Sequence, residues 1–175
     1  TCFVLKYRLV QIKDDPLKEF MADYFTGQQK IRAHQKLFLA DGLTAIKYVR
    51  AHAKDYGVNP DRVGIIGFSA GGHLASTAGT HFDGGDPKSA DPIEQVSCRP
   101  DFTILIYPVI SMGEKTHQGS RKNLLGAQPS PEMVELFSNE KQVNEKTPPT
   151  FLAHALDDKV VVPENSKIFY EACQA

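Results

Sequence analysis

The fold is decided by the stretch Gly64-Ile65-Ile66-Gly67-Phe68-Ser69-Ala70-Gly71-Gly72-His73-Leu74-Ala75, in which an apolar strand runs directly into a helix of small residues. The junction carries the pattern Gly-x-Ser-x-Gly, which is typical of a serine held on a sharp turn between a strand and a helix. Such a turn predicts a strained backbone at Ser69, and we expect the missing side chains of Gly67 and Gly71 to leave room for neighbouring elements. The Ser69 hydroxyl would then be exposed above the sheet.

Strands and helices alternate on both sides of this junction, which predicts βαβ crossovers and a mainly parallel sheet in an α/β fold. The strands are short apolar runs, and the run before Ser69 is predicted to be covered on both faces. The expected strands are Cys2–Leu5, Arg62–Gly67, Phe102–Tyr107 and Thr150–Ala155, and the expected helices are 37–57 with Gly57 as its cap, Ala70–Thr80, one that opens at Ser130-Pro131-Glu132, and one from Pro163 or Asn165 through Phe169.

The composition is that of one ordinary globular domain. With 175 residues, 41% of them hydrophobic and 23% charged, the chain can bury a single core and differs from disordered or disulfide-framework proteins. Its 20 Lys and Arg against 21 Asp and Glu give a net charge of −1, which provides no electrostatic footprint for nucleic acid or an anionic membrane. The longest apolar stretch, Ile104–Ile110, is too short to cross a bilayer. We therefore expect a small or polymeric substrate and no nucleic-acid or membrane partner.

The three cysteines, Cys2, Cys98 and Cys173, have neither CxxC nor Cys/His ligand spacing, so we expect reduced, mostly buried thiols and no metal site. The chain starts at Thr1 in an apolar run, without an initiator methionine or a leader, so we expect its true beginning to be missing. The sequence leaves open whether the protein is cytoplasmic or exported, and it leaves its oligomeric state open.

A serine hydroxyl becomes a nucleophile only when a histidine takes its proton and a carboxylate orients that histidine. Asp157 and Asp158 follow the strand expected at 150–155, and the carboxyl edge of a parallel sheet is where catalytic groups gather. The alternative is that both aspartates are only turn residues. The backbone N–H of Ala70, at the start of a helix, can donate to an oxyanion. A phosphate-binding turn is the alternative for Ser69, although such loops have other glycine spacing and usually a lysine.

With these motifs the chain resembles the α/β-hydrolase serine esterases, and among them the acetyl-xylan-esterase-like and hormone-sensitive-lipase-like carbohydrate esterases. The resemblance covers nearly the whole chain and implies a three-layer α/β-hydrolase core that needs no cofactor. It also implies that the acid is the fourth residue after His154, which selects Asp158 over Asp157. The matching segments are Lys6–Leu9, Gly67–His73, Tyr107–Ile110, Asp157-Asp158 and Pro163–Ser166.

In these families the histidine follows the acid after one more strand, and a His-Gly-Gly-Gly loop precedes the strand that corresponds to Cys2–Leu5. Only 17 residues follow Asp158, and the last loop and helix need them, so we expect the further strand and its histidine to be missing from this sequence. We expect the His-Gly-Gly-Gly loop to be missing as well, because this sequence starts at the strand that the loop would precede. We therefore expect 1–175 to be a single partial α/β-hydrolase domain that lacks N-terminal strands and the last strand, with an excursion over 10–36 and a cap segment or surface loops over 111–147. Such a chain should be inactive alone.

None of the six histidines is an obvious substitute. His73 lies one helical turn after Ser69, where helix packing is the more ordinary role, and His154 lies in a strand, where a buried, hydrogen-bonded imidazole is expected. The remaining four are expected to be solvated surface residues: His34, His52, His81 and His117.

The resemblance predicts a serine carboxylesterase for short acyl esters, with acetyl groups on xylan or other sugars as candidate substrates. Ser69 would be the nucleophile, Ala70 an oxyanion donor, and Asp158 the residue that orients a histidine outside this chain. Two alternatives remain open, namely a serine peptidase of the prolyl-oligopeptidase kind and a non-catalytic binding module with the same fold.

Overall fold

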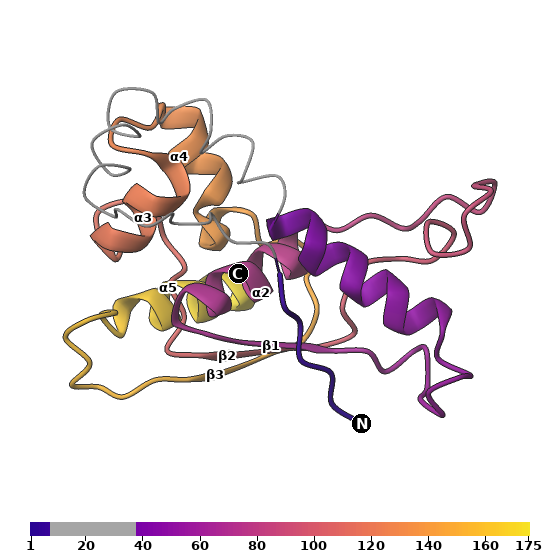
Figure 1. Ribbon diagram of the computed structural model, residues 1–175. Helices are drawn as coiled ribbons and strands as arrows, with labels where there is room; N and C mark the ends of the chain where they lie inside the picture. Colours follow the sequence, from indigo (N-terminus) through magenta and orange to yellow (C-terminus); the bar gives the residue numbers. More distant parts are fainter. Residues whose placement is uncertain (8–37) are drawn as a thin grey trace, which may run out of the picture.

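The computed structural model describes residues 1–7 and 38–175 (Figure 1). The excursion predicted over 10–36 and His34 therefore lie outside the described residues. In the described part the sheet has three parallel strands in the order β1-β2-β3, namely β1 Ile65–Phe68, β2 Thr103–Ile106 and β3 Thr150–Ala153. These strands confirm the predicted positions and direction, although each is shorter than expected. Because the strands are parallel, the residues that follow them meet at one edge.

One face of the sheet packs against helices. Residues 38–51 form a helix that is followed by turns up to Gly57, whose φ of 62° is in the left-handed region favoured by glycine. Helices α2 Ser69–Thr80 and α5 Glu164–Gln174 lie on the same side of the sheet (Figure 1). Two groups of buried side chains join these helices to the strands: Ala75, Leu105, Ile110 and Phe169, and Ile46, Val63 and Ala78.

The opposite face of the sheet is open among the described residues. Side chains alternate along a strand, so Ile65 and Leu105 point to the helices while Ile66, Ile104 and Phe151 stand opposite one another on the other face. Ile66 is 51% exposed and Phe151 is 61% exposed. We predicted that the strand before Ser69, which is β1, is covered on both faces. This prediction is wrong for the described residues, which form two of the three expected layers.

The strand expected at Cys2–Leu5 is also absent, and residues 1–7 have no regular secondary structure. Val4 is 94% exposed, and the ring of Phe3 packs on that of Tyr56, with centroids 4.9 Å apart. An apolar run becomes a strand only when a neighbour supplies backbone hydrogen bonds, and none of the described strands pairs with this segment. The expectation of mostly buried thiols is wrong as well, because only Cys98 is buried; all three cysteines are free, as predicted.

The segment 111–147 contains three short helices: α3 Gln118–Leu125, α4 Pro131–Phe137 and the 3-10 helix η1 Asn139–Lys141. The predicted start of α4 is confirmed, since Ser130 accepts a hydrogen bond from Met133 N and Pro131 is the first helical residue. α3 was not expected, because its cap is His117, a residue type that sequence rules rarely place there. Its buried apolar residues Met112, Leu125 and Phe137 pack in one cluster with Val109 and Val161, from the loops after β2 and β3.

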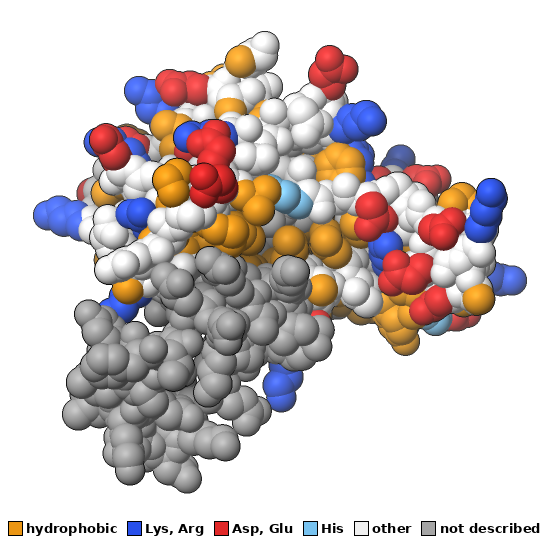
Figure 2. Space-filling model, turned by 90° about the horizontal axis from the view of Figure 1, so that it is seen from above, with side chains coloured by type: hydrophobic (Ala, Val, Ile, Leu, Met, Phe, Trp, Pro, Cys, Tyr) orange, Lys and Arg blue, Asp and Glu red, His pale blue; other side chains and the backbone are white. Residues whose placement is uncertain are grey.

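Seen from the helical side, hydrophobic side chains gather near the middle of the molecule, and acidic and basic side chains are interspersed around them (Figure 2). No helix among residues 1–7 and 38–175 is long and apolar enough to cross a bilayer.

Candidate active site

Ser69 is the first residue of α2, and its φ of 50° lies in the left-handed region. A non-glycine residue in that region is strained, so the strain predicted for this turn is confirmed. Gly67 shows why the turn needs glycine, because a Cβ there would lie 2.1 Å from the carbonyl oxygen of Gly71. The same role predicted for Gly71 is not borne out by the described residues, none of which would lie within 4 Å of a Cβ at that position. The second close approach is at Gly72, where a Cβ would lie 2.6 Å from the Cβ of Pro108.

The loop after β2 fixes this turn from the side. Val109 N donates a hydrogen bond of 3.0 Å to the Ser69 carbonyl oxygen, and Tyr107 N donates one of 2.7 Å to the carbonyl of Ala153 in β3. Tyr107 has a φ of 36° and is, with Ser69, one of two non-glycine residues with positive φ in the described chain. Both lie at the carboxyl ends of adjacent strands, where strained residues often mark functional sites.

Ser69 is half-buried and Ala70 is exposed. The N–H of Ala70 belongs to the first turn of α2, where an α-helix supplies no acceptor of its own. Such an N–H can serve as a donor to a negatively charged oxygen near Ser69.

Asp158 lies in the turn after β3, at the same edge of the sheet. Its Oδ1 accepts hydrogen bonds from Val160 N at 2.8 Å and Val161 N at 3.0 Å. These bonds stabilise the ionised carboxylate and lower the pKa of Asp158 below its usual value. Asp157 is exposed, whereas Asp158 is half-buried and anchored by these two hydrogen bonds.

His154 is held beside this acid. Its Nε2 donates to the carbonyl of Val161 at 2.8 Å, and its Nδ1 is hydrogen-bonded to Ser166 Oγ at 2.8 Å. Nε2 also lies 3.6 Å from Asp158 Oδ2. The side chain is 5% exposed. The prediction of a buried, hydrogen-bonded imidazole is confirmed.

His73 packs inside the molecule rather than toward solvent. Its Nε2 donates to the carbonyl of Phe137 at 2.8 Å, and burial lowers the pKa of His73 to about 4. Asn139, in η1, donates to Ser76 Oγ and Thr77 Oγ1 on the same helix. His73 is therefore a neutral packing residue, as expected, and its ring nitrogens serve the helix contact instead of Ser69.

The other described histidines are half-buried rather than solvated, which corrects the prediction for them. His52 stacks on Tyr48, His81 follows α2 and has a pKa lowered by burial, and His117 caps α3. In the described part of the chain, no group of three or more His, Cys, Asp or Glu side chains is arranged to hold a metal ion.

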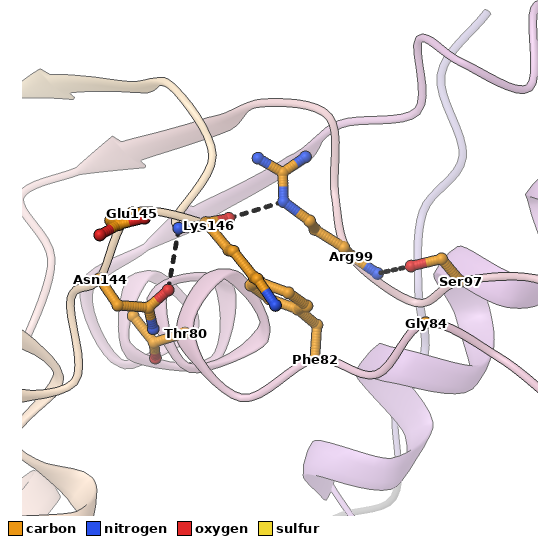
Figure 3. A pocket seen from close by; sticks show the side chains of 8 residues that line it. All are labelled: Thr80, Phe82, Gly84, Ser97, Arg99, Asn144, Glu145 and Lys146. Atoms are coloured by element: carbon orange, nitrogen blue, oxygen red, sulfur yellow. Dashed lines mark hydrogen bonds between the residues drawn. The ribbon is translucent and has the colours of Figure 1, made fainter.

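Two hollows lie away from Ser69. One, of about 680 Å³, lies at the amino-terminal ends of β2 and β3, between the end of α2 and the loops that lead into these strands (Figure 3). Arg99 Nε donates there to the Lys146 carbonyl at 2.6 Å, and none of the predicted site residues lines this hollow. The other, of about 590 Å³, lies beside the edge strand β3 and α5 and is lined in part by Leu152, His154 and Tyr170.

The chain is similar to several known proteins. Residues 30–173 match the family model BD-FAE. Over 121 residues the chain is 44% identical to endo-1,4-beta-xylanase B of Butyrivibrio fibrisolvens. The aligned region covers 69% of this chain and 19% of the relative. It is 40% identical over 125 residues to an acetylxylan esterase of Xylanibacter ruminicola, which covers 69% of this chain and 24% of that protein. The chain thus spans about a fifth to a quarter of these relatives.

Solved structures show the same architecture. An acetyl ester-xyloside bifunctional hydrolase from Caldicellulosiruptor lactoaceticus superimposes with a TM-score of 0.77 at 52% identity, over 79% of this chain and 51% of that one. The carboxylesterase Cest-2923 from Lactobacillus plantarum, at 23% identity and a TM-score of 0.60, shares the fold, with 79% of this chain and 49% of that chain covered. The expected α/β-hydrolase fold is confirmed, and the chain belongs to the BD-FAE family of α/β-hydrolase esterase domains.

Proposed function

We propose that the protein to which these 175 residues belong is a serine carboxylesterase that removes short acyl groups, acetyl groups above all, from carbohydrates. The observation that carries this proposal is the strained Ser69 at the start of α2, on the same edge of the sheet as the anchored carboxylate of Asp158. Strain of this kind persists where the surrounding structure holds a reactive group in place.

The proposed reaction is a double displacement. Ser69 Oγ attacks the ester carbonyl carbon while a histidine takes its proton, and the resulting oxyanion accepts a hydrogen bond from Ala70 N–H. The histidine returns the proton to the departing alcohol, which leaves an acyl-serine. Water then attacks that acyl group, the histidine again takes and returns the proton, and Asp158 stabilises the charged imidazole in both steps.

We propose that the histidine comes from outside residues 1–175. His73 and His154 have ring nitrogens engaged in hydrogen bonds with Phe137, Val161 and Ser166. Within 1–7 and 38–175 β3 is the last strand on its side of the sheet, and the 590 Å³ hollow beside it offers room for further polypeptide next to the Asp158 turn. Because a serine without its base loses about 10⁶ in kcat, the 175-residue chain alone should be almost inactive.

The carbohydrate ester is proposed on the strength of the relatives, one of which is named an acetylxylan esterase and another an acetyl ester-xyloside hydrolase. A serine peptidase would share the turn and the acid, so the substrate must be tested directly.

The full-length protein and its Ser69→Ala variant should be assayed on acetylated xylan, p-nitrophenyl acetate and a chromogenic peptide, with fluorophosphonate labelling in parallel. We expect labelling and acetate release in the wild type only, and little peptide hydrolysis. Peptide hydrolysis above ester hydrolysis would indicate a peptidase. Absence of labelling in the wild type would indicate a non-catalytic module and overturn the proposal.

A further inference from the structure

Two buried asparagines, Asn139 and Asn165, bind the loop that follows β2. Asn139 lies in η1 and Asn165 in the first turn of α5, and both side chains are fully buried, at 0% exposure. A buried amide is costly unless its N–H and C=O groups are paired, so its partners reveal what it holds together. Neither residue belongs to the Gly-x-Ser-x-Gly turn or to the acid turn.

Asn139 is tied to the helix that Ser69 begins. Its Nδ2 donates to Ser76 Oγ at 2.7 Å, to Thr77 Oγ1 at 2.9 Å and to the His73 carbonyl at 3.2 Å. Its backbone N–H donates to the Ile110 carbonyl at 3.3 Å. Asn139 therefore joins α2 to the loop after β2.

Asn165 binds the same loop from the other side. Its Oδ1 accepts from Ile110 N at 2.9 Å and from Ser111 N at 3.1 Å. Its Nδ2 donates to the Lys115 carbonyl at 2.9 Å and to the Val162 carbonyl at 3.2 Å. Val162 directly follows Val161, whose N–H binds Asp158 Oδ1.

Ile110 is thus held through both of its backbone polar groups, its carbonyl by Asn139 and its N–H by Asn165. η1 contacts both α2 and α5, so the two asparagines close one continuous buried network between these helices. Apolar packing alone would let the helices slide by small amounts, whereas directional hydrogen bonds between buried groups favour one arrangement.

We propose that Asn139 and Asn165 are positioning residues that fix the separation of the Ser69 turn from the Asp158 turn. This inference rests on the proposed esterase function. The asparagines touch neither substrate nor the reacting atoms. Through its Nδ2, Asn139 holds α2, the helix that Ser69 begins, and Asn165 joins the loop after β2 to the loop after β3 that carries Asp158. A shift of about 1 Å between catalytic groups can cost on the order of 10²-fold in rate.

The test uses the full-length protein and the variants Asn139→Asp and Asn165→Asp, which keep the size of the side chain and remove the N–H donors. Asn144→Asp is the matched control, because Asn144 is exposed and lies at the opposite edge of the sheet (Figure 3). Fluorophosphonate titration counts the reactive Ser69 groups, so kcat can be stated per reactive site. Asn139→Ser and Asn165→Ser serve if an aspartate variant does not fold.

We expect Asn139→Asp and Asn165→Asp each to lower kcat per titrated site on p-nitrophenyl acetate by about 10- to 100-fold, with KM changed less than about threefold. The control variant Asn144→Asp should keep the wild-type kcat and KM. A merely structural role would lower the melting temperature and the titrated fraction but leave kcat per site at the wild-type value, and that result would overturn the inference. If the wild type itself is not labelled, the proposed function fails. If the wild type is labelled but Asn139→Asp and Asn165→Asp keep its kcat per titrated site, only the positioning role is overturned.

Discussion

The backbone N–H of Val109 donates a hydrogen bond of 3.0 Å to the carbonyl oxygen of Ser69. The strained turn after β1 is thereby bound to the loop after β2, which is itself bound by Asn139 and Asn165. The conformation of Ser69 is therefore supported by residues far away in the sequence, and strain that costs stability is retained at the one hydroxyl that the proposed chemistry needs.

Relief of that strain should raise stability. Ser69→Gly and Ser69→Ala both remove the hydroxyl, but only glycine accepts a φ of 50° without a penalty. We expect Ser69→Gly to be more stable than Ser69→Ala by about 1 kcal/mol, measured as the difference in urea unfolding free energy. Equal stabilities would show that the turn is not strained.

Two glycines four residues apart should respond in opposite ways to alanine. A Cβ at position 67 would lie 2.1 Å from the backbone oxygen of Gly71, which cannot move without the helix, whereas a Cβ at position 71 would have no described residue within 4 Å. We expect Gly67→Ala to cost at least about 2 kcal/mol of unfolding free energy. Gly71→Ala should be neutral or stabilising by up to about 1 kcal/mol, because alanine favours helix. Thermal or urea unfolding of the pair decides the matter, and a tolerated Gly67→Ala would contradict the geometry.

His73 should make stability depend on pH. Its pKa is about 4 in the folded protein against a usual 6.5, because burial disfavours the charged ring. Between these values the unfolded chain binds a proton that the folded protein does not, so stability is lost as the pH falls from 6.5 toward 4, by roughly 3 kcal/mol in total. Urea unfolding at pH 7, 5.5 and 4.5 should show a shallower decline for His73→Gln than for wild type. Parallel declines would rule out this source of acid sensitivity.

The two neighbouring aspartates provide a matched pair for the proposed chemistry. In the full-length protein Asp158→Asn removes the charge that would stabilise an imidazolium, and we expect kcat to fall by about 10⁴-fold. Asp157→Asn, at an exposed side chain, should remain close to wild type. Initial rates on p-nitrophenyl acetate per labelled Ser69 separate the two, and a reversed order would transfer the role to Asp157.

Local patterns in the sequence predicted β1, β2, β3, α2, α4 and α5, the cap at Ser130, and the strained serine turn. These features depend on residues within one or two turns of each other, so their hydrogen bonds and backbone angles can be inferred from neighbouring side chains. The sequence also predicts that Ser69 and Asp158 lie at the same end of the sheet, because each follows a parallel strand.

Other features arise only when distant segments meet. Cys2–Leu5 has the composition of a strand but no paired neighbour among the described strands. Gly71 has the spacing of a packing glycine, but no residue of the described part of the chain packs where its Cβ would be. Asn139 and Asn165 look like ordinary polar residues until η1 and α5 bring them against Ile110. Burial and hydrogen bonding between remote segments depend on which surfaces come together, and the period of a short stretch carries no information about that partner.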